Sequence, residues 1–170
     1  TDTDGDGYVD KDGEKLSINW LTYPTRLEQP KLAEYAQSTL KDIGIDVQVN
    51  NTSDHMTIAK SGDFDVYVSS TTTAPTGDPE YFFTSTVTGA KNYGNYQNEE
   101  VTKLTDQLHQ TFDKDERAKL AVELQQDILD DDAFFFVSHL NMGIVTKSNV
   151  TGMAAHPCDY YEITADLDVE

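Results

Sequence analysis

Residues 15–51, KLSINWLTYPTRLEQPKLAEYAQSTLKDIGIDVQVNN, carry the clearest secondary-structure pattern in the chain. Residues 15–23 and 45–51 alternate apolar and polar side chains, which is typical of strands. Between them, apolar residues recur at helical spacing and Gly44 follows as a helix stop. The face predicted to be buried consists of Leu32, Tyr35, Ala36, Thr39, Leu40 and Ile43. A strand, a helix of about 13 residues and a second strand form a β–α–β pattern, which predicts two parallel strands.

Segments further along the chain extend this α/β pattern. FDVYVSS at 64–70 is apolar almost throughout, as a strand covered on both faces requires. Asp78 followed by Pro79 is a helix-start signal. The later expected elements are helices at 98–112 and 113–132 and a strand within 133–146. The apolar stripe of the first of these helices consists of Val101, Leu104, Leu108 and Phe112. We therefore expect an α/β fold, a mixed and mostly parallel sheet flanked by helices, in a single domain over residues 1–170.

The charge balance narrows the class of partner. The 170 residues include 31 acidic and 12 basic side chains, giving a formal net charge of −19. Nucleic acid is excluded as an expected partner, because phosphate binding needs clustered Lys and Arg. The single cysteine, Cys158, allows no internal disulfide. The four histidines lack zinc spacing and no nucleophile or phosphate-binding motif occurs, so we expect no catalytic residues and no enzyme activity.

The N-terminal stretch TDTDGDGYVDKDG has the offsets of a calcium loop. Counted from Asp2, loop positions 1, 3, 5 and 9 are aspartates, Gly7 is at the sharp-turn position, and Tyr8 can offer its carbonyl. The candidate calcium ligands are Asp2, Asp4, Asp6, Tyr8 and Asp10. Gly13 stands where a bidentate Glu should close the site, and a strand follows instead of a helix. The alternative is an acidic turn or hairpin over residues 1–14, with Asp-Gly pairs forming tight turns.

Two polar loops could contact a ligand. They cover residues 71–83 and 89–98, and they carry Thr, Pro, Asn, Gly and Tyr. Loops at the carboxyl ends of parallel strands are where α/β folds bind small molecules. The alternative is that their aromatic rings only cap the sheet edge.

Several segments taken in order resemble one protein family. They are DTDGDGYVDKDGEKLSINWLTYP, GIDVQV, GDFDVYVSS, GDPEYFF, NYGNYQNEEVTKL, FDKDERAKLAVELQQDIL and FFFVSHLNMGIVTKSNVTGM, covering residues 2–153. The chain resembles the extracellular solute-binding proteins (family 5) of ABC importers for peptides, nickel and metal chelates. The resemblance implies a lobe of the type II periplasmic-binding-protein kind, here the C-terminal lobe of a two-lobed protein, with residues 154–170 returning toward the hinge.

The resemblance also implies a function and its partners. Such proteins trap a peptide, metal chelate or similar small solute between two lobes and deliver it to ABC permease subunits. The implied partners are the solute, the N-terminal lobe of the same parent chain and the permease. The implied location is the periplasm, or the extracellular face of a membrane that carries the parent as a lipoprotein. The alternative function is a calcium-stabilised extracellular structural or adhesion module.

The ligand-binding residues follow from the same resemblance. The cleft would be lined by Ser70, Thr71, Thr72, Thr73, Ala74 and Pro75, with Asn92, Tyr93 and Tyr96 nearby. Peptide-binding members carry an aspartate shortly before the Asp-Pro helix start, where this chain has Pro75. The Ala74-Pro75 pair instead resembles the loop of nickel-type members, with Glu80 in place of a histidine. These residues would form hydrogen bonds and aromatic contacts with the solute, and none would act in catalysis.

Overall fold

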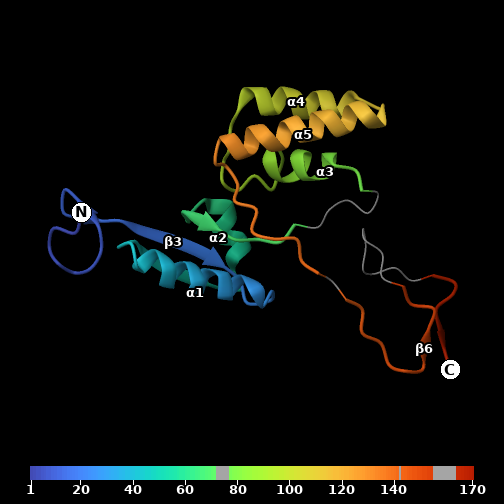
Figure 1. The fold of residues 1–170 in the computed structure, drawn as a ribbon, viewed down its shortest axis with the longest axis horizontal. Helices are drawn as coiled ribbons and strands as arrows, with labels where there is room; N and C mark the ends of the chain where they lie inside the picture. The colour runs from blue at the N-terminus through green and yellow to red at the C-terminus, as the bar shows by residue number, and fades with distance from the viewer. Residues whose placement is uncertain (72–76, 142, 155–163) are drawn as a thin grey trace. The chain divides into compact units, whose positions relative to one another are not determined.

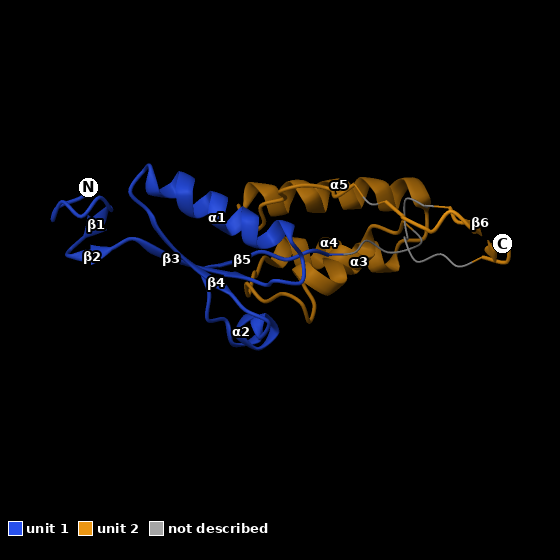
Figure 2. Ribbon diagram, turned by 90° about the horizontal axis from the view of Figure 1, so that it is seen from below, with its two compact units in different colours: residues 1–71 blue, residues 72–170 orange. Residues whose placement is uncertain are grey.

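The computed structural model describes residues 1–71, 77–141, 143–154 and 164–170. The chain divides into two compact units, residues 1–71 and residues 72–170 (Figure 2). The expected single domain over residues 1–170 would contain both units, and it stays a prediction. Among the described helices, none combines the length and the apolar character needed to cross a membrane.

The first unit is built on a parallel sheet. Its strands are β3 (Ser17–Thr22), β4 (Asp46–Asn51) and β5 (Val66–Tyr67), ordered β4-β3-β5, and both pairings are parallel. Helix α1 (Glu28–Lys41) packs on β3 and β4, and α2 (His55–Ser61) packs on β3 from the opposite side (Figures 1 and 2). This arrangement confirms the parallel β–α–β prediction.

Two details of this unit differ from the sequence-based expectation. The strand expected over 64–70 is only the two residues of β5. Helix α1 buries Gln29 and Ala33, whereas Tyr35 is 70% exposed and Ile43 is 64% exposed. The expected apolar face was therefore wrong at Tyr35 and Ile43, and also at Thr39, which is exposed. The sheet meets the neighbouring face of α1, which carries Gln29 and Ala33, and Ile43 lies beyond the end of the helix at Lys41.

A short hairpin precedes the sheet. Strands β1 (Asp10–Lys11) and β2 (Glu14–Lys15) pair antiparallel around Asp12 and Gly13, whose φ angles are 56° and 83°. Two successive positive φ angles are the conformation of a type I′ turn, for which Asp-Gly is well suited. The pairing agrees with the expected hairpin at its residues 10–14, and the choice between an acidic turn and a calcium loop over residues 1–14 stays a prediction.

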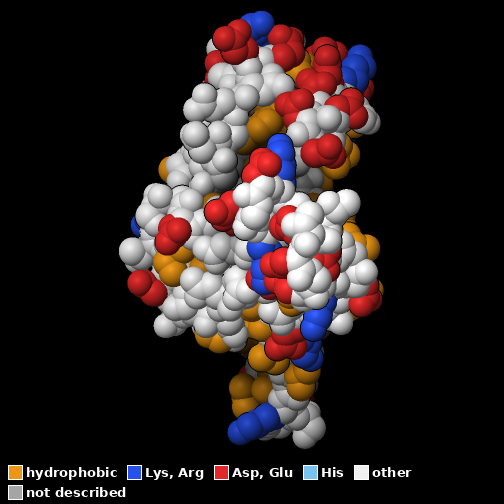
Figure 3. Space-filling view, turned by 90° about the vertical axis from the view of Figure 1, so that its left-hand side faces the viewer, with side chains coloured by type: hydrophobic (Ala, Val, Ile, Leu, Met, Phe, Trp, Pro, Cys, Tyr) orange, Lys and Arg blue, Asp and Glu red, His pale blue; other side chains and the backbone are white. Residues whose placement is uncertain are grey.

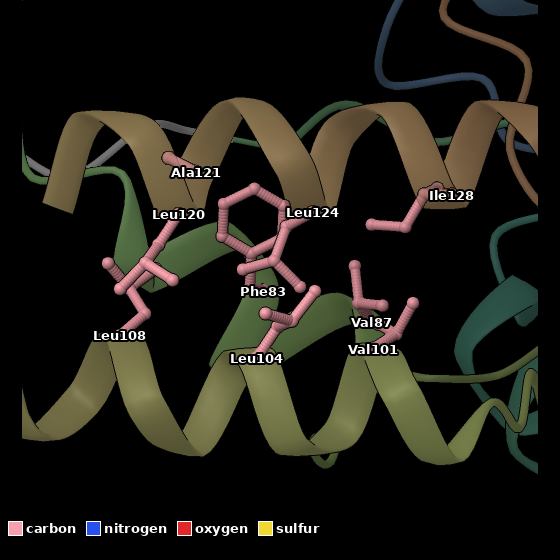
Figure 4. Packing of buried hydrophobic residues seen from close by; sticks show 9 residues of the cluster. All are labelled: Phe83, Val87, Val101, Leu104, Leu108, Leu120, Ala121, Leu124 and Ile128. Atoms are coloured by element: carbon pink, nitrogen blue, oxygen red, sulfur yellow. The ribbon is translucent and has the colours of Figure 1, made fainter. Parts of the chain in front are cut away.

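The described helices of the second unit lie between residues 80 and 130. Helix α3 (Glu80–Phe82) continues into a π-helical turn, η1 (Phe83–Val87), and α4 (Glu99–Gln110) and α5 (Lys114–Asp130) follow. Asn98 and Asp113 cap the last two helices by accepting backbone N–H bonds, as their residue types favour. The apolar faces meet in one buried cluster (Figure 4), formed by Phe83, Val87, Val101, Leu104, Leu108, Leu120, Ala121, Leu124 and Ile128.

Apolar residues at two places were expected to be covered and are not. Phe112 is 92% exposed, because α4 ends at Gln110 and Phe112 lies beyond the buried stripe. The described part of 133–146 forms no β-strand. The Phe135 side chain in this segment is 90% exposed. The expected strand was therefore wrong there. Further on, β6 (Val150–Thr151) pairs antiparallel with β7 (Asp168–Val169).

Candidate functional site

Polar and aromatic side chains gather at the carboxyl edge of the parallel sheet. Tyr23 directly follows β3, His55 opens the helix after β4, and Tyr67 and Ser70 end and follow β5. Gln29 reaches this edge from the first turn of α1. Because parallel strands all end on the same side, residues that follow them in sequence meet in space. We call these five residues, Tyr23, Gln29, His55, Tyr67 and Ser70, the carboxyl-edge cluster.

Gln29 forms the buried centre of this cluster. Its side chain is only 2% exposed. In one orientation of its amide, Nε2 donates to the Tyr23 hydroxyl at 3.0 Å and to the Ser70 hydroxyl at 2.9 Å. In the other, the amide oxygen accepts from the Ser70 backbone N–H at 2.9 Å and the nitrogen donates to the Val68 carbonyl at 3.2 Å. We assign the second orientation, because it gives both ends of the amide partners of the correct kind.

His55 packs against the tyrosines of the cluster. Its ring stacks on Tyr23 with centroids 4.0 Å apart and planes 18° apart, and its Nδ1 lies 2.8 Å from the Tyr67 hydroxyl. Burial lowers the pKa of His55 below its ordinary value of 6.5, while the charge of Asp54 acts in the opposite direction. At neutral pH the edge therefore holds a neutral, half-buried imidazole between the half-buried phenol of Tyr67 and the buried phenol of Tyr23.

Part of the expected ligand site falls within this cluster. Ser70 is exposed even though its backbone and hydroxyl contact buried Gln29, and Thr71 is also exposed. Thr72, Thr73, Ala74 and Pro75 lie outside the described residues. Sequence reasoning missed the other four members of the cluster, Tyr23, Gln29, His55 and Tyr67. The position of Tyr23 immediately after a strand could have signalled it, whereas Gln29 carries no comparable local signal.

The other expected ligand residues belong to the second unit, where they make local contacts. The Asn92 side chain donates to the Tyr96 carbonyl at 2.8 Å and accepts from the Tyr96 N–H at 2.9 Å. The Tyr96 hydroxyl donates to Asp131 at 2.6 Å. Burial, together with the Asp131 carboxylate, raises the pKa of Tyr96 to about 12. Tyr93 is half-buried in the same loop, and ligand contact by these residues stays a prediction.

An ion-pair network fixes the start of α3. Arg117 Nη2 donates to both oxygens of Asp78 at 2.6 and 2.8 Å and to Glu80 at 3.0 Å, while Nη1 donates to the carbonyls of Leu108 and Thr111 at 2.7 and 2.6 Å. Asp78 also accepts from the Glu80 N–H at 2.9 Å, which agrees with its expected capping role. That N–H bond and Arg117 hold the pKa of Asp78 below its ordinary value. The network therefore anchors the chain directly after residues 72–76.

The acidic loop, residues 1–10, brings carboxylates close together. Oxygens of Asp2, Asp4 and Asp10 lie within 4.8 Å of one another. Asp2 accepts from the N–H groups of Gly5 and Gly7 at 2.7 and 3.0 Å. These bonds support the backbone of the loop, and calcium binding stays a prediction.

Asp6 and Asp10 have further partners of their own. Asp6 pairs with Lys15 at 3.0 Å, and Asp10 accepts two bonds from Thr3, each at 2.6 Å. The bond from Lys15 lowers the pKa of Asp6, and the bonds from Thr3 lower that of Asp10. Elsewhere, Figure 3 shows acidic side chains spread over the visible face with basic ones scattered among them.

Comparison with known proteins gives a consistent result. Residues 1–94 match the family described as bacterial extracellular solute-binding proteins, family 5 Middle. The oligopeptide-binding protein AppA of Bacillus subtilis is 29% identical over 168 residues, which cover 95% of this chain and 31% of that protein. The nickel-binding protein NikA of Staphylococcus aureus is 28% identical over 168 residues, covering 97% of this chain and 34% of that protein. The chain thus spans about a third of the length of these relatives.

Solved structures of the same two relatives match as well. NikA from S. aureus in complex with Ni(L-His)2 has a TM-score of 0.62 and 32% identity, covering 65% of this chain and 24% of that one. AppA from B. subtilis in complex with a nonapeptide has a TM-score of 0.60 and 28% identity, covering 78% of this chain and 27% of that one. These findings confirm the resemblance and the α/β fold inferred from the sequence. The chain belongs to the bacterial extracellular solute-binding proteins, family 5.

Proposed function

We propose that this chain is the C-terminal lobe of the substrate-binding component of an ABC importer. The complete protein captures a small solute between two lobes and delivers it to the permease without chemical change. Family membership supports this function, and the carboxyl-edge cluster is the observation within the chain that carries it. The cluster combines the exposed Ser70, the half-buried rings of His55 and Tyr67, and a buried support formed by Tyr23 and Gln29. Polar and aromatic groups of this kind are typical of a solute-binding edge.

The proposed solute is a peptide, a metal chelate or a similar small molecule. The NikA structure is a complex with Ni(L-His)2, and the AppA structure is a complex with a nonapeptide. Ser70 and Thr71 are the described residues that we assign to solute contact, together with the segment through Pro75. By resemblance, Pro75 in place of an aspartate favours a chelate over a free peptide.

The proposed setting is outside the cytoplasmic membrane. The parent protein would be periplasmic or lipid-anchored on the extracellular face, with the N-terminal lobe and the permease as its partners. Closure of two lobes about a hinge is one of the known ways in which a protein encloses a ligand. The acidic surface is compatible with solubility in such a compartment.

Isothermal titration calorimetry of the full-length parent protein tests this function. Ni(L-His)2 and a nonapeptide serve as probes, and we expect saturable binding of at least one of them. Ser70→Ala should weaken that binding, whereas Ser61→Ala should not, because Ser61 lies at the end of α2 and donates to the Ile58 carbonyl. A folded parent that binds neither probe, or binding unaffected by Ser70→Ala, would count against the proposal.

A further inference from the structure

Gln29 extends the hydrogen-bond ladder of the sheet past the end of β3. The Val68 N–H donates to the Leu21 carbonyl at 3.1 Å, as a neighbouring strand residue does. Beyond that bond, the Gln29 amide replaces a strand: its nitrogen donates to the Val68 carbonyl at 3.2 Å and its oxygen accepts from the Ser70 N–H at 2.9 Å. The side chain therefore holds the backbone of residues 68–70 in an extended course.

Two further bonds tie this amide to the cluster. The Gln29 oxygen also accepts from the Tyr23 hydroxyl at 3.0 Å and from the Ser70 hydroxyl at 2.9 Å. Tyr23 is itself held by the stacked ring of His55. Burying the Gln29 amide, which is 2% exposed, would be unfavourable if the amide lacked hydrogen-bond partners. Its partners include the backbone N–H and the hydroxyl of Ser70, the residue at which the predicted solute-contacting segment begins.

We propose that Gln29 is a positioning residue for solute binding: it fixes Ser70, a residue assigned to solute contact, without touching the solute. This inference rests on the proposed function. A contact preset in the unliganded protein saves the entropy cost of ordering it when the solute arrives. Gln29 therefore raises solute affinity through Ser70, in addition to stabilising the fold.

The chain offers a matched control on the same helix. Gln37 donates from Nε2 to the Val47 carbonyl at 2.6 Å, so it too binds strand backbone through a side-chain amide. Val47 lies near the amino end of β4, away from the carboxyl edge. Gln29→Met and Gln37→Met each keep an unbranched side chain and remove an amide, and only the first removes support from Ser70.

The experiment measures two quantities in the full-length parent protein. Hydrogen exchange of the Ser70 amide is followed without ligand, and affinity is followed with Ni(L-His)2 and a nonapeptide. Gln29→Met should accelerate Ser70 exchange and weaken probe binding, each by about tenfold or more, corresponding to the loss of one or two hydrogen bonds. Gln37→Met should change both by less than about twofold. If Gln29→Met does not fold, Tyr23→Phe removes one hydroxyl from the same network and should shift both quantities in the same direction.

Each other outcome has a distinct meaning. Unchanged Ser70 exchange in Gln29→Met, or in Tyr23→Phe where that variant replaces it, would overturn the positioning role. Faster exchange with an affinity loss no larger than that of Gln37→Met would show that Gln29 is purely structural. A wild-type parent that binds neither probe would overturn the proposed function and with it the role in binding, while the exchange rates would still show whether Gln29 holds Ser70.

Discussion

Replacing Arg117 with methionine should lower the free energy of unfolding by about 2 kcal/mol. The Arg117 side chain is 15% exposed and Glu80 is 21% exposed, so solvent screens their ion pair only partly. Asp78 is 42% exposed, and its share must be discounted for screening. The two bonds to backbone carbonyls and the pair with Glu80 then contribute roughly 0.5–1 kcal/mol each. Methionine preserves most of the stem, which limits the loss of packing.

Urea unfolding followed by circular dichroism measures this cost. Lys119→Met is the matched control on the same helix, because Lys119 pairs with Glu116 at 3.2 Å and the two side chains are 74% and 48% exposed. An exposed pair of this kind contributes at most about 0.5 kcal/mol. A loss for Arg117→Met no larger than that of the control would refute the reasoning.

The pH dependence provides an independent check. The His109 bond and the pairing with Arg117 lower the pKa of Glu80 below 4.5, and the Glu80 N–H and Arg117 lower that of Asp78 below 3.8. The unfolded chain therefore takes up these protons first, so the stabilisation is present above the ordinary pKa values and disappears as pH falls through the lowered ones. The stability difference between wild type and Arg117→Met should shrink below about pH 4. The share contributed by the bonds to the Leu108 and Thr111 carbonyls does not titrate and should persist in strong acid. A difference that does not shrink at all between neutral pH and strong acid would contradict the ion-pair account.

Three further predictions concern the core, a histidine and the acidic loop. Leu124→Ala should lower the free energy of unfolding, measured with urea, by about 3 kcal/mol, because Leu124 is fully buried. The control Val122→Ala should lower it by less than about 0.5 kcal/mol, because Val122 is 66% exposed. Burial lowers the pKa of His55 below 6.5, so the unfolded chain binds a proton that the folded chain does not. The free energy of unfolding should therefore decrease as pH drops below 6.5. His55→Phe should remove the contribution of this residue to that decrease. If the acidic loop binds calcium, thermal unfolding should shift upward with millimolar calcium and return with EDTA; a midpoint unaffected by either would leave the loop as a hairpin turn only.

The local periodicity of residues 15–51 was enough to predict β3, α1, β4 and their parallel pairing. It was not enough to select the buried face of α1. Gln29 is polar, and it is buried only because Tyr23, Val68 and Ser70 supply its hydrogen bonds. That information is tertiary, so no pattern within the helix contains it.

Other features of the fold and site also depend on distant partners. Asp78 and Arg117 are 39 residues apart, and in a chain with 31 acidic residues nothing local selects that pair. The apolar run around Phe135 has the composition of a β-strand. A strand also needs a neighbouring strand to pair with, and none of the described strands lies beside this run. The family, by contrast, was predictable, because it depends on the order of many short segments and not on any single contact.

A crystal structure of the full-length parent protein with a bound solute would show whether the solute contacts the carboxyl edge of the sheet. The solute to use is whichever of Ni(L-His)2 and the nonapeptide binds in calorimetry. The account predicts a solute within hydrogen-bond distance of the 70–75 segment, with Gln29 still bound to Val68 and Ser70 and making no contact with the solute. A solute seated away from the carboxyl edge of the β4-β3-β5 sheet would contradict it.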